Sequence, residues 1–187
     1  MKHIWNTIIA ILFAVMICTP SGVMAAEKEA GATASLSATT FGELNSLNDR
    51  VTHLEGYLAS KNSPLTDSAK ELVSEADRLG IDWKLVTAIA GTESYFGQHI
   101  PQNSYNAWGW AIFTGMSDGK HFDGWEHGIQ TVSEGLKQNY VDRGLTTVEK
   151  IGTKYAADPQ WSYKVNHFMD EIEAFKPKKP NQLAMSI

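Results

Sequence analysis

The sequence predicts a mainly α-helical domain with one small β-hairpin inserted near its middle and a short helical stalk in front of it. Over most of residues 44–175, apolar residues recur three or four positions apart, as they do on one face of a helix. Between residues 98 and 124 this period is lost, and a Ser117-Asp118-Gly119 turn separates two apolar stretches. The chain has 187 residues, of which 43% are hydrophobic, so it can bury one core and carry a short appendage.

Residues 1–25 have the layout of a secretory signal peptide. Lys2 and His3 precede an apolar run from Ile8 to Ile17, and small residues end the segment at Ala25 and Ala26. We expect cleavage after Ala25 or Ala26, which predicts a protein that is secreted to the cell wall or another extracytoplasmic site. The apolar run is too short for a comfortable span, so no stable membrane span is expected after cleavage. An uncleaved anchor is the alternative.

Charge and cysteine content exclude some classes of function. The 16 basic and 21 acidic residues give a formal charge of −5, which disfavours a nucleic-acid partner because such proteins need a concentrated basic face. The single cysteine, Cys18, lies inside the predicted signal segment and follows Ile17, which is not the small residue that a lipoprotein site has. The mature chain would therefore have neither thiol catalysis nor a cysteine metal site.

Residues 26–62 are predicted to be a linker followed by a short heptad helix. The stretch Glu27–Thr40 is rich in Ala, Ser, Thr and Gly, which is typical of a flexible linker. Apolar residues then follow at alternating spacings of three and four: Leu44, Leu47, Val51, Leu54 and Leu58. Such a seam on Leu44–Leu58 would serve either self-association or docking on the chain's own domain.

The compact domain is predicted over residues 63–175. Ser63 and Pro64 have the order of an N-cap and first helical residue, and Gly80 is placed to end that helix. Asp82 is expected to cap a second helix that ends near Gly97.

Helical spacing returns after the predicted hairpin, in Ile129–Tyr140. Thr146 and Glu149 form a capping-box pattern for the next helix, and Asp158-Pro159 begins the last one, which runs to Phe175. Residues 176–187 are predicted to be a basic, flexible tail.

Glu93 is the most informative single residue. Ile89 and Leu85 lie four and eight positions before it and Ala90 lies three before it, so Glu93 continues an apolar stripe. Loss of water and the negative end of the helix would both raise the pKa of a carboxyl placed there. A carboxyl that stays protonated near neutral pH suits a general acid that delivers a proton to a glycosidic oxygen. The alternative is a carboxyl held by a basic or backbone partner.

Three short segments occur in the order found in a known family. Glu93-Ser-Tyr-Phe-Gly97 is followed by Asn106-Ala-Trp-Gly109, and later by Tyr155-Ala-Ala-Asp-Pro-Gln-Trp161. In this respect residues 63–175 resemble the bacterial endo-β-N-acetylglucosaminidases of the lysozyme-like superfamily. Phe122-Asp-Gly-Trp-Glu126 also looks like the passage that follows the hairpin in that family. One departure is Trp108, where the family usually has Phe.

The resemblance implies a lysozyme-like fold and cleavage of peptidoglycan glycan strands at the β-N-acetylglucosaminyl bond. It makes Glu93 the proton donor and puts Tyr155 across the cleft, where it orients the substrate or stabilises the transition state. For Tyr155 there is an alternative, in which the ring packs beside Ile151 and the hydroxyl bonds to the backbone. Ser94 is expected to form hydrogen bonds at the helix end.

A second catalytic carboxylate is not obvious from the sequence. Asp123 is our catalytic candidate, beside Asp118 and Glu126, although Asp118 suits a turn and the other two suit helix caps. Without a second carboxylate, the substrate's acetamido group would take its place, or a lytic transglycosylase would leave an anhydro sugar at the neighbouring muramyl bond.

Aromatic residues around the predicted cleft suit the flat apolar faces of sugars. The substrate-binding candidates are Tyr95, Tyr105, Asn106, Trp108 and Trp110, with Trp125 nearby. Asn106 would hydrogen-bond an acetamido group or sit in a turn with positive φ. Trp83 and Trp161 are expected to be core.

No metal site and no cofactor are expected, because the histidines show no paired ligand spacing: His99, His121, His127 and His167. The rival from another class is a non-catalytic wall-binding or scaffold protein that uses the Leu44–Leu58 seam to oligomerise, since a fold does not by itself determine activity.

Overall fold

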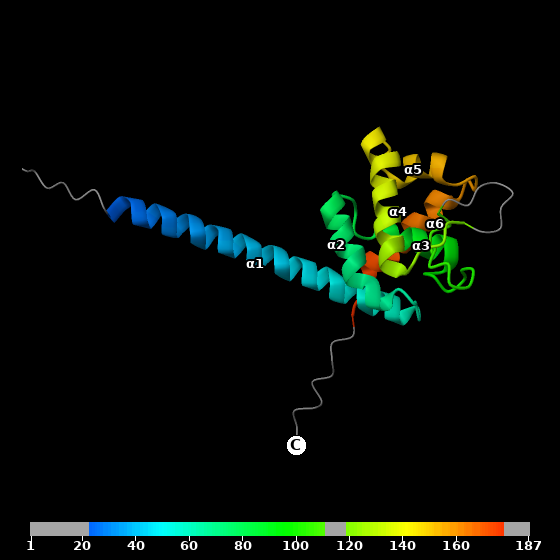
Figure 1. Cartoon of the computed structure of the whole chain (residues 1–187), viewed down its shortest axis with the longest axis horizontal. Helices are drawn as coiled ribbons and strands as arrows, with labels where there is room; N and C mark the ends of the chain where they lie inside the picture. Colours follow the sequence, from blue (N-terminus) through cyan, green and yellow to red (C-terminus); the bar gives the residue numbers. More distant parts are fainter. Residues whose placement is uncertain (1–22, 111–118, 178–187) are drawn as a thin grey trace, which may run out of the picture. The chain divides into compact units, whose positions relative to one another are not determined.

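The computed structural model describes residues 23–110 and 119–177. The described residues form six α-helices and no strand, which confirms the mainly α class (Figure 1). The helices are α1 (Val23–Ser60), α2 (Ala69–Leu79), α3 (Leu85–Ser94), α4 (Trp125–Asn139), α5 (Val148–Tyr155) and α6 (Trp161–Ala174), with 3-10 turns at Thr66–Ser68 and Val141–Arg143. Two compact units are distinguished, residues 1–42 and 43–187. Within the described parts, no helix is both long enough and apolar enough to cross a bilayer.

Helix α1 corrects the prediction of a flexible linker. It runs without interruption from Val23 to Ser60 and so includes the stretch Glu27–Thr40. No proline interrupts this sequence, and its alanines, glutamates and lysine favour a helix. The linker prediction gave too little weight to these helix-forming residues. The predicted signal segment, residues 1–25, lies outside the described residues except for its last three positions.

The second half of the heptad seam docks on its own domain. Leu54 and Leu58 are fully buried and Tyr57 is 2% exposed, whereas Leu44 is 49% exposed. The Tyr57 hydroxyl donates to Glu171 Oε2 in α6 at 2.9 Å. The predicted domain start at residue 63 is therefore too late, because the end of α1 belongs to the core.

Helix α2 ends as predicted but begins later. Gly80 caps it in the left-handed conformation (φ 64°), which a residue without Cβ adopts at little cost. Ser63 does not cap α2. Its Oγ accepts from Leu65 N at 3.0 Å and donates to Phe96 O at 2.8 Å, so Ser63 ties the incoming turn to the residues that follow α3.

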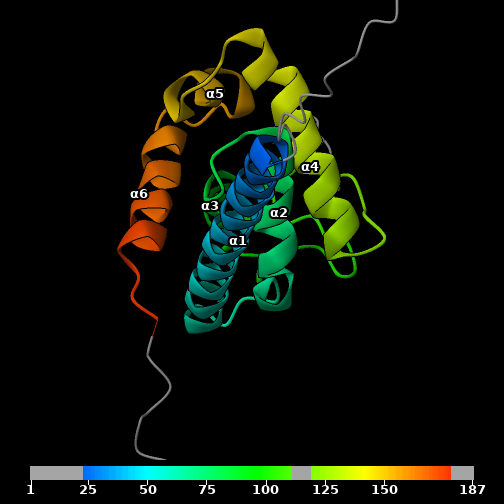
Figure 2. The same ribbon diagram turned by 90° about the vertical axis from the view of Figure 1, so that its left-hand side faces the viewer.

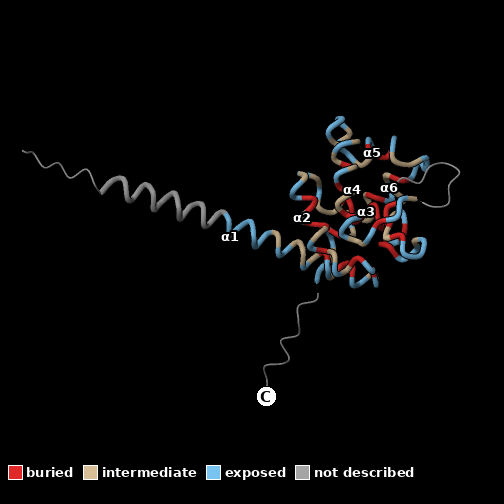
Figure 3. The backbone as a smooth tube through the Cα atoms, viewed as in Figure 1, coloured by how far each residue is buried: buried red, intermediate tan, exposed pale blue. Residues whose placement is uncertain are grey.

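Helix α3 is the centre of the domain. Every residue from Leu85 to Gly91 is buried, and α6 packs along the helix, while α2 and α4 make smaller contacts with it (Figure 3). Gly91 is needed there, because a Cβ at this position would lie 2.7 Å from the Phe96 ring and 3.0 Å from Phe168. The predicted cap Asp82 accepts from Lys84 N at 2.9 Å.

Helices α4, α5 and α6 follow the predicted periods, and α5 joins the end of α4 to the start of α6 (Figure 2). The cap of α5 is Thr147, whose Oγ1 accepts from Lys150 N, so the capping residue lies one position after the predicted Thr146. Asp158 Oδ1 accepts from Gln160 N at the turn into α6. The buried face of α6 includes Trp161, Val165 and Ile172, as expected.

The predicted hairpin lies partly outside the described residues, since 111–118 are not described. Its flanks approach each other: Lys120 N donates to Trp110 O at 3.1 Å. Of the predicted tail, residues 178–187 also lie outside the description.

Candidate active site

Glu93 lines an open hollow between the end of α3 and α6. The hollow has a volume of about 430 Å³ and is lined by Gly91, Thr92, Glu93, Ser94, Tyr95, His99, Tyr163, Lys164, His167 and Phe168. We call it the Glu93 hollow. The same lining contains the rings of Tyr95, which is 43% exposed, and Tyr163, which is 75% exposed. An acid that shares a hollow with exposed aromatic rings suits a carbohydrate ligand.

The Glu93 carboxyl is held by one neutral donor. Trp161 Nε1 donates to Glu93 Oε1 at 2.7 Å. The residue is exposed, so solvent reaches it, yet the protein around the hollow displaces enough water to raise the pKa of Glu93 above its ordinary value. The Trp161 hydrogen bond and the charge of Lys164 oppose this rise, and Asp158 adds to it.

No ion pair joins Glu93 to a basic side chain among the described residues. Lys164 lines the same hollow, but its Nζ binds Asp158 Oδ2 at 2.7 Å. The carboxyl is therefore neither enclosed nor neutralised by a cation. A carboxyl with a raised pKa that is open to a hollow can donate a proton to a bound ligand.

The turn after Glu93 sets the direction of the next side chains. Tyr95, Phe96 and Gly97 all have positive φ (51°, 60° and 85°), which is costly for the two non-glycine residues. This turn buries Phe96 completely and leaves Tyr95 at the hollow. Ser94 stabilises it from inside: its Oγ donates to Ala107 O at 2.8 Å and accepts from Gly97 N at 2.9 Å. Ser94 thus forms the predicted hydrogen bonds at the helix end.

Tyr155 does not present a free hydroxyl to the hollow. Its hydroxyl donates to Trp108 O at 2.8 Å, and its ring stacks on Trp161 with centroids 4.8 Å apart and planes at 24°. Burial raises the pKa of Tyr155 well above its ordinary value. Of the two predicted readings, the hydroxyl bond to the backbone is the one observed, although the main ring partner is Trp161 rather than Ile151.

Trp108 and Asn106 are internal, which corrects their prediction as substrate-binding residues. Trp108 is fully buried, and its Nε1 donates to Val86 O at 2.9 Å. The Asn106 amide donates to Trp110 O and Lys120 O, both at 2.9 Å, and its Oδ1 accepts from Trp110 N at 2.9 Å and Trp108 N at 3.4 Å. An amide with four such bonds has no donor or acceptor left for an acetamido group.

Tyr105 and Trp110 are partly buried and lie outside the lining of the Glu93 hollow. Tyr105 packs edge-on against Trp125, with centroids 5.3 Å apart. Trp110 packs on Tyr155 and over Gly135, where a Cβ would lie 2.2 Å from the indole. Of the five predicted binding residues, only Tyr95 lines the hollow. Trp83 and Trp161 pack with the core as predicted.

The predicted second carboxylate is not in the hollow. The Asp123 side chain is 96% exposed and pairs with His127 at 3.1 Å, one turn into α4. Glu126 is exposed and accepts from Gln130 at 3.4 Å, while Asp118 lies outside the described residues. Asp158 is the carboxylate that acts on Glu93 electrostatically, but its bond to Lys164 lowers the pKa of Asp158 and occupies one of its oxygens.

His99 and His167 line the hollow, whereas His127 pairs with Asp123. The described residues contain no group of three or more side chains that could hold a metal ion.

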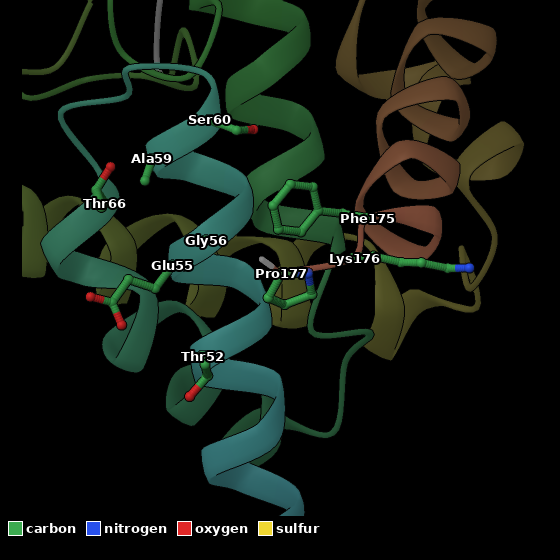
Figure 4. Close-up of a pocket in the computed structure, with 9 residues that line it drawn as sticks. All are labelled: Thr52, Glu55, Gly56, Ala59, Ser60, Thr66, Phe175, Lys176 and Pro177. Atoms are coloured by element: carbon green, nitrogen blue, oxygen red, sulfur yellow. The ribbon is translucent and has the colours of Figure 1, made fainter. Parts of the chain in front are cut away.

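A second open cavity, of about 540 Å³, lies beside the end of α1. Figure 4 shows the Phe175 and Pro177 rings turned toward the Gly56 stretch of this helix. Its charged lining residues are Glu55 and Lys176, and its one aromatic lining residue is Phe175, so it lacks the exposed tyrosines of the Glu93 hollow. The Glu93 hollow is therefore the better candidate for chemistry.

No protein-family model matches the chain, and no curated protein matches it. Sequence reasoning missed three residues of the site: Trp161, expected only in the core, and Tyr163 and Lys164, which line the hollow. The one available signal was the Tyr155–Trp161 segment, which ends at Trp161 and is followed closely by Tyr163 and Lys164.

Proposed function

We propose that this protein is a secreted peptidoglycan glycosidase that uses Glu93 as its general acid. The observation that carries the proposal is one carboxyl with a raised pKa that lines a hollow together with two exposed tyrosines, Tyr95 and Tyr163. Such a carboxyl is protonated over a wider pH range than an ordinary glutamate, and flat rings stack on sugar faces. The bond cleaved is the β-N-acetylglucosaminyl bond. A lysozyme-like fold with a hairpin over residues 98–124 is part of this proposal.

In the proposed reaction Glu93 gives its proton to the bridging oxygen as the bond from that oxygen to the anomeric carbon breaks. The leaving sugar departs as an alcohol, and the anomeric carbon must receive an electron pair from another group. In the hydrolytic route the substrate's acetamido oxygen supplies the pair and water then replaces it, returning the acid and leaving a reducing end. This route needs no second carboxylate.

A lytic transglycosylase is the second candidate, and one observation favours it. Among the described residues that line the hollow, Glu93 is the sole carboxylate, so no second carboxylate there would activate water as in an inverting hydrolase. In that route the 6-hydroxyl of a muramyl residue attacks its own anomeric carbon and gives its proton to the Glu93 carboxylate, which restores the acid, and the product is an anhydro sugar. Both routes use the same acid.

A zymogram with purified cell wall tests the proposal. The full chain should clear the gel, and Glu93→Gln should not, because the amide keeps the shape but has no proton to give. Asp123→Asn is the matched control, since it removes an equal charge from an exposed position. Mass spectrometry of the released fragments then separates reducing glucosamine ends from reducing muramic ends and anhydro ends. Binding to the wall without clearing at any pH would contradict the proposal and favour the scaffold.

A further inference from the structure

Glu93, Trp161 and Tyr155 form a continuous chain of contacts that ends on the backbone. Trp161 Nε1 donates to Glu93 Oε1 at 2.7 Å, the Tyr155 ring stacks on the Trp161 indole, and the Tyr155 hydroxyl donates to Trp108 O at 2.8 Å. The chain joins α3, the loop after it, α5 and α6. Each contact joins residues from two different elements, so the position of the Glu93 carboxyl is fixed relative to α5, α6 and the loop that contains Trp108.

The first link constrains the carboxyl chemically as well as sterically. An indole N–H is a donor only, so it cannot take a proton from Glu93 and must bind an oxygen that offers a lone pair. Oε1 is thereby occupied, and among the described residues no other hydrogen bond reaches the Glu93 carboxyl. The proton of the neutral acid then belongs on Oε2, the oxygen that is left for a ligand.

The indole itself has little freedom. Trp161 is 3% exposed, and the Tyr155 ring covers one of its faces. At Gly152, a Cβ would lie 3.0 Å from the Trp161 ring and 2.2 Å from Ser162 Oγ, so the absence of a side chain there leaves the room that the indole fills. A tryptophan packed this tightly keeps its N–H directed at one point.

We propose that Trp161 and Tyr155 are positioning residues for the Glu93 acid: Trp161 fixes Oε1, and Tyr155 acts through Trp161 and not on the substrate. This inference rests on the proposed function, and it changes the role of Tyr155 from a group that faces the sugar to one that supports the acid. The pKa of Glu93 is consistent with this contact, because burial raises the pKa and the hydrogen bond from Trp161 to Oε1 limits that rise.

Other groups around the hollow also affect a titration. Lys164, His99 and His167 line it, Asp158 acts on Glu93 from the turn before α6, and Glu171 faces His167 at 3.5 Å. The test must therefore distinguish the titration of Glu93 from the titration of these neighbours. Glu93→Gln does this, because it removes the Glu93 carboxyl and leaves the other groups in place.

The decisive measurement is the indole N–H resonance of Trp161 in the full chain, followed by NMR as the pH changes. We expect this resonance to titrate with the same midpoint as the Glu93 side-chain carboxyl carbon, and to lose that transition in Glu93→Gln. The measurement needs no change to Trp161 or Tyr155, so it stands even where those variants fail to fold. If the chemical shift of the Trp161 indole N–H does not change through the Glu93 titration, the proposal is overturned.

Variants test the consequence for turnover. In Trp161→Phe the pKa of Glu93 should rise, the alkaline limb of the activity profile should move to higher pH, and kcat should fall on the order of 10- to 100-fold because the acid loses its position. Trp83→Phe, which removes a partly buried indole away from the hollow, is the control and should move neither limb.

Tyr155→Phe keeps the ring that stacks on Trp161 and should keep an indole resonance that titrates with Glu93, whereas Tyr155→Ala should behave like Trp161→Phe. Loss of turnover in Tyr155→Phe with the indole titration intact would show that the hydroxyl acts on the substrate and would overturn the proposal. A wild-type chain that releases no wall fragments would refute the proposed function, and the NMR measurement would still decide the positioning of Glu93.

Discussion

The end of α1 should contribute to the stability of the domain, and two leucines on the same helix test this. Leu54 is fully buried, whereas Leu44 is 49% exposed. Replacing a fully buried leucine by alanine costs about 3 kcal/mol, from the lost transfer of its methyl groups and the cavity left behind. With an m-value of about 2 kcal/mol per molar urea, this moves the midpoint down by about 1.5 M. Leu44→Ala should change the free energy of unfolding by less than about 0.5 kcal/mol.

The assay is equilibrium urea unfolding of both variants, followed by circular dichroism and by tryptophan fluorescence. The same reasoning extends to a truncation: a chain that begins at residue 63 lacks Leu54, Tyr57 and Leu58, and also the pair of Arg50 with Asp77 at 2.6 Å. Losing three buried side chains costs on the order of 8 kcal/mol, comparable to the whole stability of a small domain. Equal midpoint shifts in the two leucine variants, or a truncated chain that unfolds cooperatively at the wild-type urea concentration, would refute this reasoning.

Three further predictions concern residues that the sequence put forward for the site. The pKa of Glu93 is raised in the folded protein, so its contribution to stability is fully present below the ordinary value of 4.5 and is lost as the pH rises through the folded-state pKa. Glu93→Gln should therefore melt at a higher temperature than wild type at about pH 8 but not at about pH 4. An equal difference in melting temperature at both pH values would contradict the raised pKa. Asn106→Ala should lower the free energy of unfolding by about 3 kcal/mol, since it removes an amide with four backbone hydrogen bonds. If the variant melts at the wild-type temperature but binds the wall more weakly, Asn106 is a ligand contact instead. Asp123→Asn should keep wall-clearing activity within about twofold, as measured by turbidity, because its side chain is 96% exposed; inactivity would restore it as the second carboxylate.

The helices were predictable because their signals are local. The Gly80 end of α2, the Asp82 turn that precedes α3 and the buried face of α6 all depend on residues within a few positions of one another, although the N-cap position of α3 is Lys84 and not the predicted Asp82. The errors are local too: Thr147 instead of Thr146 caps α5, and α2 begins at Ala69, because neighbouring hydroxyls and a 3-10 turn compete for the same helix start.

For Glu93 the sequence pattern predicted a raised pKa but not the surroundings of the carboxyl. The apolar stripe through Leu85 and Ile89 suggested a carboxyl that faces the interior or a cleft, and burial does raise its pKa. Yet α3 is buried on all sides from Leu85 to Gly91, so the stripe alone could not say which way its last turn faces. The aromatic candidates show the same limit. Tyr95 and Trp108 look alike as candidate rings in the sequence, but one lies at the hollow and the other is fully buried.

What the sequence determined by itself was the mainly helical class, the Gly80 end of α2 and the place of Glu93 at the end of an apolar helical stripe. Which groups surround that carboxyl was decided only by tertiary structure, because its hydrogen-bond donor, Trp161, is 68 residues away in the chain. The docking of α1 is similar, since Tyr57 meets its partner 114 residues later. Periodicity and capping arise from neighbours along the chain, whereas a site arises from side chains that meet after the helices have packed.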